Sequence, residues 1–364
     1  MMYRNVWSVF CVPLTHWAGQ PRRLASWLCL AAAAGLATGQ IDSATAADDP
    51  EAVADGPWIS SVAWQDDNTL LGTRSQSLLF RPAEVVQASA DNPGELKVVG
   101  ESPSALWSVL PAADGQAVAS DYKGGVHLYS AGAEGKAFEL DARWIRALAP
   151  SPTANEILAG TEDGKLLVLS VDKAQELRRV DAHAAAIFDI AVSAAGDKIA
   201  TAAGDGTLKI FSWPELEPQG EMQVGREAIW SVAFVNQDKQ LISGGADRAV
   251  QLWDVATASS IVTIASAHNW VTSLAPLPKS NLVLAGCMDG SIVVVDVKTM
   301  LAVAQEKVAD SGIWSIALSP DGQRLALGTR KHGIAVVNVQ PWKKAGRTAA
   351  QQARMIRPPA PKKG

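Results

Sequence analysis

The chain has 364 residues, of which 48% are hydrophobic, so most of it can bury a substantial core and extensive disorder is excluded. Residues 1–46 carry three bases and one acid, and residues 341–364 carry seven bases and no acid. Of the chain's 32 bases and 37 acids, 22 bases and 36 acids therefore remain for residues 47–340, a net charge of −14. So acidic a body repels phosphates, which argues against nucleic-acid binding.

Residues 1–46 have the features of a secretory signal peptide. Arg22 and Arg23 precede an apolar run, residues 24–36, and the segment ends in Ala44-Thr45-Ala46, which suits cleavage. The apolar run is too short for a comfortable membrane span. Three tryptophans in the first 27 residues are unusual for a signal, so an uncleaved anchor stays open. We expect a bacterial protein that is exported to the periplasm or the extracellular space.

From residue 57 onwards the chain repeats one unit of about 42 residues. Four aspartates follow one another at intervals of 42, and three of them precede a glycine, which is a hairpin signal: Asp163, Asp205, Asp247 and Asp289. In phase with them, each unit opens with the pattern apolar-x-x-apolar, whose first residue we call the anchor. The seven anchors are Ile59, Leu106, Ile145, Ile187, Ile229, Val271 and Ile313. The first interval is 47 residues long, which suggests a loop insertion near residues 87–94.

Each unit contains four short strand patterns, for example 241–245, 250–253 and 261–265 after the opening strand of the fifth unit. Four strands in such a unit are typical of a propeller blade. We therefore predict an all-β fold, a seven-bladed β-propeller with four-stranded antiparallel blades over residues 57–340. The seventh unit lacks an obvious fourth strand. We expect residues near 51–57, in the N-terminal segment of residues 47–56, to supply that strand and close the ring.

Several short motifs resemble those of WD40-repeat proteins. Trp253-Asp254 stands where that family has its Trp-Asp pair, and Ala182-His183 is similar to the Gly-His that opens a repeat. The resemblance implies that His183, Thr201 and Asp205 form a structural hydrogen-bond network, with Phe211 in place of the family's Trp. It also implies structural roles for the turn residues and the namesake Trp, which are Asp163, Asp247, Asp289 and Trp253. The turn aspartate is replaced in units one, two and seven by Ser75, Lys123 and Lys331.

Every unit has one aromatic residue directly beside its anchor. These residues are Trp58, Trp107, Trp144, Phe188, Trp230, Trp270 and Trp314. The resemblance implies that they face the central funnel at its top, together with Arg146. Tryptophan and arginine dominate binding hot spots, and flat rings also suit sugars, proline-rich peptides and cations. Rings that wedge between blades are the alternative, because three of the seven precede the anchor and four follow it.

The residue two after each anchor is expected on the channel wall. The seven are Ser61, Ser108, Ala147, Asp189, Ser231, Ser273 and Ser315. One carboxylate cannot supply the roughly six to eight oxygens that Ca²⁺ takes, which argues against a metal-dependent propeller hydrolase. The histidines after the signal, His127, His183, His268 and His332, lack zinc-like spacing. Cys287 stands in an apolar strand and is expected to be buried. We predict no metal, no cofactor and no catalytic residue.

These patterns favour a non-catalytic, monomeric scaffold that binds a protein or peptide at the aromatic-lined top face. The alternative is a carbohydrate-binding propeller, or a propeller enzyme of the lactonase or hydrolase kind, with its site at the central funnel. For that chemistry the sequence offers few ionisable groups, namely Asp189, Arg146 and Glu227. The basic tail, residues 341–364, is expected to be disordered and available to an anionic surface.

Overall fold

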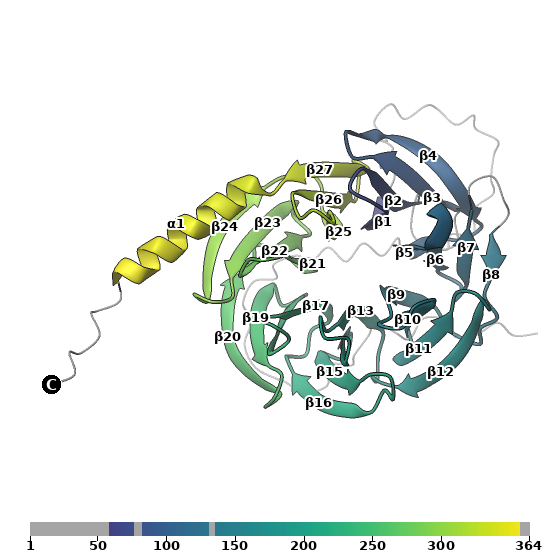
Figure 1. Ribbon diagram of the computed structural model, residues 1–364, viewed down its shortest axis with the longest axis horizontal. Coiled ribbons are helices and arrows are strands. Elements are labelled where there is room, and N and C mark those ends of the chain that lie inside the picture. The colour runs from purple at the N-terminus through teal and green to yellow at the C-terminus, as the bar shows by residue number, and fades with distance from the viewer. Residues whose placement is uncertain (1–57, 76–81, 131–134, 357–364) are drawn as a thin grey trace, which may run out of the picture. The chain divides into compact units, whose positions relative to one another are not determined.

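Seven antiparallel sheets surround a central axis in the computed structural model (Figure 1). The model describes residues 58–75, 82–130 and 135–356, the last eight of these by their backbone alone. Each sheet is one blade, and its strands follow one another in sequence from the axis outwards. The predicted all-β, seven-bladed propeller is confirmed.

The inner strands, one for each blade, are β1 (Trp58–Trp64), β5 (Leu106–Pro111), β9 (Ile145–Pro150), β13 (Ile187–Val192), β17 (Ile229–Val235), β21 (Val271–Pro276) and β25 (Ile313–Leu318). The second strands are β2 (Thr69–Ser75), β6 (Ala117–Asp121), β10 (Glu156–Thr161), β14 (Lys198–Ala203), β18 (Gln240–Gly245), β22 (Leu282–Cys287) and β26 (Arg324–Thr329). The third strands are β3 (Ala83–Ser89), β7 (Val126–Tyr129), β11 (Lys165–Ser170), β15 (Thr207–Ser212), β19 (Ala249–Asp254), β23 (Ser291–Asp296) and β27 (Ile334–Asn338). The outer strands are β4 (Asn92–Ser102), β8 (Lys136–Ala137), β12 (Gln175–Asp181), β16 (Pro218–Gln223), β20 (Ser259–Ser266) and β24 (Leu301–Lys307).

The core lies between neighbouring blades. All seven anchors are at most 2% exposed, because each packs between its own blade and a neighbour. The second and third strands of blade six, β22 and β23, are buried along their whole length, which explains their continuous apolar sequences. The outer strand β24 is largely exposed and mostly polar at its end. Burial therefore falls from the middle of a blade to its rim.

Blade seven has three strands among the described residues, and its fourth was expected from residues 51–57, which lie outside them. Side chains nevertheless join blade seven to blade one. Trp64 donates its indole N–H to the carbonyl of Ala317 at 2.8 Å. The Arg324 guanidinium lies 5.4 Å from the Trp64 ring and donates to Asp91 at 3.2 Å. The described part of the ring is thus closed by contacts between its first and last blades.

The long first unit has a different cause from the predicted one. Residues 87–94 belong to the hairpin of β3 and β4, so a loop insertion there is wrong. Seven residues, 76–82, separate β2 from β3, whereas three residues, 204–206, separate β14 from β15. The extra length of the first unit therefore falls largely between its second and third strands.

The C-terminal segment is helical where the sequence predicted a disordered tail. Helix α1 spans Gln340–Ile356, so that expectation is wrong for this part of the chain. Trp342 is 3% exposed and joins the cluster of Leu284 and Leu325 between blades six and seven. Its indole N–H donates to Glu306 at 3.0 Å. One buried aromatic side chain thus supplies the packing that the tail's composition did not suggest. Within the described ranges, no helix has the length and apolar character of a membrane span.

Candidate functional site

A β-bulge recurs at the same point in every inner strand. In blade five, Ile229 pairs with Gly245 and Ser231 with Gly244, so Trp230 between them has no partner on the next strand. The residue directly after the anchor is skipped in the same way in blades two to seven. In blade one, Ser60 and Ser61 together lie opposite the unpaired position of β2. A bulge re-aims the extra side chain, so the sequence places seven re-aimed side chains at one level of the ring.

These bulged residues line a central cavity of about 440 Å³. They are Ser60, Trp107, Arg146, Phe188, Trp230, Thr272 and Trp314. Four of the seven predicted aromatic residues therefore face the channel.

The three aromatic residues that precede their anchors, Trp58, Trp144 and Trp270, are not among the residues that line this cavity. Trp270 is the most open of the set, at 42% exposed, and the other two are partly buried. Trp144 has a backbone φ of +22°, a conformation that residues other than glycine rarely adopt. The seven predicted aromatic residues thus form two sets. Four follow their anchors and line the cavity wall, and three precede their anchors and do not line it.

A simple sequence signal distinguishes the two sets. Where the aromatic residue follows the anchor, the preceding position is small: Ala105, Ala186, Ala228 and Gly312. Where it precedes the anchor, the bulged position is Ser60, Arg146 or Thr272. Ser60 and Thr272 donate to the anchor carbonyls of the next blades, Leu106 and Ile313, at 2.7 and 2.6 Å. These small polar side chains are therefore used to join blades.

Arg146 is held in an aromatic cluster on one side of the mouth. Its guanidinium carbon lies 4.3 Å from the ring centre of Trp107 and 5.3 Å from that of Trp144. Tyr122, which the sequence analysis missed, contributes a third ring at 5.4 Å and lies 4.1 Å from Trp144. Nε of Arg146 donates to Glu162 at 2.5 Å. The charge of Arg146 is thus already balanced within the protein.

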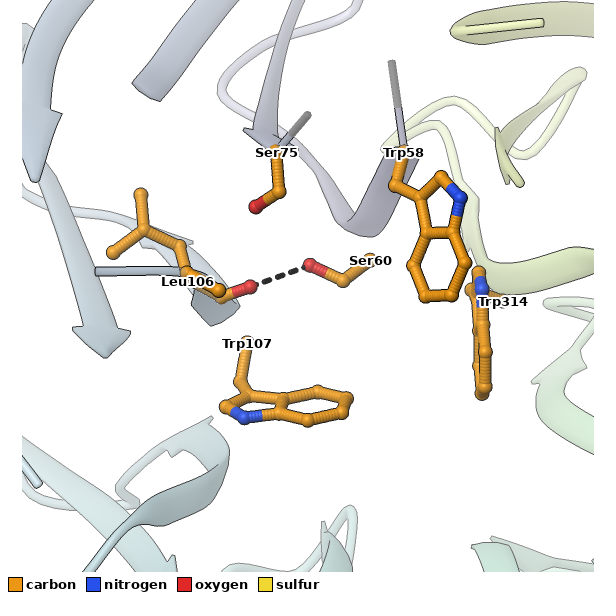
Figure 2. A pocket seen from close by; sticks show the side chains of 7 residues that line it. Trp58, Ser60, Ser75, Leu106, Trp107 and Trp314 are labelled. Atoms are coloured by element: carbon orange, nitrogen blue, oxygen red, sulfur yellow. Dashed lines mark hydrogen bonds between the residues drawn. The ribbon is translucent and has the colours of Figure 1, made fainter. Parts of the chain in front are cut away.

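The other aromatic rings contact one another in a continuous series. Phe188 lies 4.3 Å from Trp230, which in turn lies 6.0 Å from Trp270 and 6.2 Å from Trp314. Trp314 lies 5.9 Å from Trp58. Figure 2 shows Trp58 and Trp314 next to each other, with Trp107 on the opposite side of a small cavity. The volume of this cavity is about 20 Å³, enough for one water-sized group. The offset and edge contacts within this series of rings stabilise them as a preformed surface.

The residues two after each anchor form a belt around the channel. Serine Oγ atoms accept the backbone N–H of the next blade: Ser61 from Val109, Ser108 from Leu148, Ser231 from Leu274, Ser273 from Ile316 and Ser315 from Val62, at 3.1 to 3.3 Å. Asp189 accepts from Val232 at 3.0 Å. Ala147 has no side-chain oxygen that could accept the N–H of Ile190 in the next blade. Asp189 Oδ1 accepts this N–H instead, at 2.8 Å. One aspartate therefore serves two junctions.

Asp189 is the carboxylate that the sequence analysis placed on the channel wall. It accepts three hydrogen bonds, from Ile190, Val232 and the hydroxyl of Ser231 at 2.7 Å. Burial raises its pKa above the usual 3.8, against the opposing effect of these hydrogen bonds. The belt role accounts for its position without any ligand.

The predicted structural residues lie in their blades as follows. His183 contacts Thr201 at 2.7 Å and Asp205 at 3.2 Å, and Thr207 completes the set at 2.9 Å. Trp253 donates to Ser243 at 2.9 Å. The turn residues Asp163, Asp247 and Asp289 accept hydrogen bonds within their own hairpins. In blade two, where Lys123 replaces the turn aspartate, Asp121 accepts the N–H groups of Lys123 and Gly125 at 2.8 Å each.

The described residues bring no three His, Cys, Asp or Glu side chains together as metal ligands. Cys287 is buried, and burial raises the pKa of its thiol to about 11, so the reactive thiolate is suppressed at neutral pH.

The family model described as "WD domain, G-beta repeat" matches residues 174–212, 218–254 and 259–296. Each matched segment begins in or directly before the outer strand of one blade and ends with the third strand of the next. No curated protein matches the sequence. Among solved structures, the crystal structure of the WD40 β-propeller domain of Doa1 has a TM-score of 0.65 at 16% identity, over 77% of this chain and 92% of that chain. The chain is thus a seven-bladed propeller with three recognised WD repeats, and the likeness to Doa1 shows the fold.

Proposed function

We propose that this protein is a non-catalytic scaffold that binds a protein or peptide segment in the aromatic-lined mouth of its central channel. WD40 propellers commonly act as protein-interaction scaffolds, which supports the general class. The observation that carries the specific proposal is the ring of bulges, which aims Trp107, Phe188, Trp230 and Trp314 at an open cavity. Aromatic side chains that are already ordered give large contact area at low entropic cost.

The competing enzyme or sugar-binding hypothesis has less support. It depends on ionisable groups that converge on the funnel, and Asp189 and Arg146 are both engaged within the protein. Glu227, the third candidate, is exposed. Export of the protein remains a prediction from residues 1–46, outside the described residues. The cellular location of the tagged full-length chain will test it.

The binding proposal can be tested with a pooled synthetic library of random heptapeptides and the immobilised mature protein, with retained peptides identified by mass spectrometry. We expect the wild type to retain a selected subset and two variants to lose most of it. Trp230→Phe removes an indole that lines the cavity, and Trp270→Ala removes a 42% exposed ring that contacts Trp230. The matched control is Leu301→Ala, a 47% exposed apolar side chain on the outer strand β24.

Thermal melts of the three variants will establish that they are folded. Equal retention by the wild type, Trp230→Phe and Trp270→Ala would place binding elsewhere on the protein. An absence of retained peptides would contradict peptide binding altogether.

A further inference from the structure

A second arginine, Arg330, lies beside the mouth, and no carboxylate of the described residues forms an ion pair with it. It directly follows β26, and its backbone N–H donates to the carbonyl of Gly312, the residue before the anchor of blade seven. Its guanidinium carbon lies 5.1 Å from the ring centre of Trp58. Nε of Arg330 is buried and has no hydrogen-bond acceptor in the part of the chain that the structure describes.

This arrangement is unlike that of the other partly buried arginines in the described residues. Each of those has a carboxylate within 4 Å, in the pairs Arg74–Glu84, Arg146–Glu162, Arg178–Glu156 and Arg324–Asp91. The body of the protein is acidic, so carboxylates are abundant elsewhere. A partly buried guanidinium without an acceptor is unfavourable, because donors removed from water need partners.

Stacking on Trp58 occupies the face of the guanidinium and leaves its N–H edge without a carboxylate among the described residues. A cation–π contact uses the face of the planar group, whereas carboxylates bind its N–H edge. A similar stack occurs at Arg146, where the edge position is filled by Glu162. Arg146 therefore shows within the same mouth what a complete site looks like, and Arg330 has the same stack without the acid.

Further unpaired donors lie close to Trp58. Trp58, Trp107 and Trp314 line the small cavity of Figure 2 together with Ser75, whose hydroxyl points toward its centre. Ser75 is 4% exposed, and its Oγ has no hydrogen-bond partner among the described residues. The same holds for the indole N–H groups of Trp107 and Trp314. The two indoles are donors only and the Ser75 hydroxyl can also donate, so an acceptor-rich group can pair with all three.

We infer that Arg330 is the anion-binding residue of the mouth and that it receives an aspartate or glutamate side chain of the bound peptide. The inference rests on the proposed function. The acid accepts from the guanidinium edge, and a neighbouring apolar residue of the peptide packs on Trp314 and Trp230. A single guanidinium matches the two oxygens of one carboxylate.

The peptide library used above also tests this specificity, now by the acid content of the retained peptides. We expect the wild type to enrich peptides that contain Asp or Glu about tenfold over their amide counterparts, since a charge-assisted hydrogen bond typically contributes that much. Arg330→Met removes the charge and keeps an apolar side chain over Trp58. It should lose the acid enrichment while it still retains apolar and aromatic peptides. Arg347→Met, an exposed arginine on α1, is the matched control and should keep the enrichment.

Each result separates this inference from the proposed function. Retained peptides without acid enrichment, or enrichment that survives in Arg330→Met, would overturn the role of Arg330 and leave mouth binding intact. No retained peptides would overturn both. The chain also has four acids shortly before Trp58, namely Asp48, Asp49, Glu51 and Asp55. If acid enrichment emerges only when these four are replaced by their amides, the natural occupant is the chain's own segment, and the inference of a partner acid is wrong.

Discussion

The His183 network is a small set of side chains whose protonation couples to folding. Burial lowers the pKa of His183 below 6.5, and the nearby carboxylate of Asp205 opposes this only in part. The folded protein therefore holds a neutral imidazole with contacts to Thr201 and Thr207. The unfolded chain takes up a proton at higher pH than the folded chain, so stability present above about pH 6.5 is lost as the pH falls.

We predict that His183→Gln is less stable than the wild type at pH 8 by about 1–3 kcal/mol, since buried hydroxyls lose their partner. Its stability should change less between pH 7 and pH 5 than that of the wild type, because the titrating group is gone. Urea unfolding at several pH values measures both effects. His332→Gln, which replaces an exposed imidazole, should retain the wild-type slope. A wild-type slope in His183→Gln would show that another group causes the pH dependence.

The roles of single residues were predictable from the sequence where the residues recur with the repeat. They were not predictable where the role depends on contacts between residues far apart in the sequence. The anchors and turn aspartates recur at 42-residue spacing, so their places follow from counting. Tyr122 has no counterpart in other repeats, and its contact with Trp144 depends on how β6 ends beside blade three. Arg330 likewise differs from the other partly buried arginines in having no carboxylate partner among the described residues, and no sequence pattern indicates this difference.

The inner strands show how a fault in one blade is compensated in the next. Ala147 breaks the belt of acceptors, and Asp189 takes the N–H of Ile190 that would otherwise be left unpaired. The sequence analysis places both residues on the channel wall and counts Asp189 among the few ionisable groups available to a propeller enzyme. Its hydrogen bonds with Ser231 and Val232 join strands about 42 residues apart, beyond the reach of local patterns.

This compensation predicts a favourable coupling between two substitutions. Asp189→Ser leaves Ile190 without an acceptor, and Ala147→Ser supplies one from the preceding blade. We expect the double variant to be more stable than the sum of the single effects by about 1 kcal/mol. Urea unfolding of the four proteins in the cycle measures this coupling. Ala147→Ser combined with Ser273→Ala, at a distant junction, should be additive within about 0.5 kcal/mol. Additivity in the first pair would contradict the shared role of Asp189.

At the scale of the whole molecule, the number of blades was evident from the sequence and the manner of closure was not. Seven anchors in register require seven blades, because each unit can bury its faces only against its neighbours. Trp64 and Arg324, which join the first and last blades, lie 260 residues apart and belong to no repeated motif. The docking of α1 was also hidden, because it depends on Trp342 in a segment whose basic, proline-containing composition indicates disorder.

Trp342 makes the start of α1 part of the propeller. It packs with Leu284 of blade six and Leu325 of blade seven, the blade with three described strands. We expect Trp342→Ala to lower the free energy of unfolding by about 3–5 kcal/mol, as is usual when a buried aromatic side chain is truncated. Trp342→Phe, which keeps most of the apolar contact and loses the hydrogen bond to Glu306, should cost about 1 kcal/mol.

Urea unfolding followed by circular dichroism measures these values, with Arg347→Ala on the exposed part of α1 as the control within about 0.5 kcal/mol of wild type. A free energy of unfolding that rises from Trp342→Ala through Trp342→Phe to the wild type would establish that the helix closes the outer side of blades six and seven. If Trp342→Ala unfolds at the same urea concentration as wild type, α1 contributes nothing to the ring. Blade seven would then depend for its stability on β25–β27 and on the contacts of these strands with blades six and one.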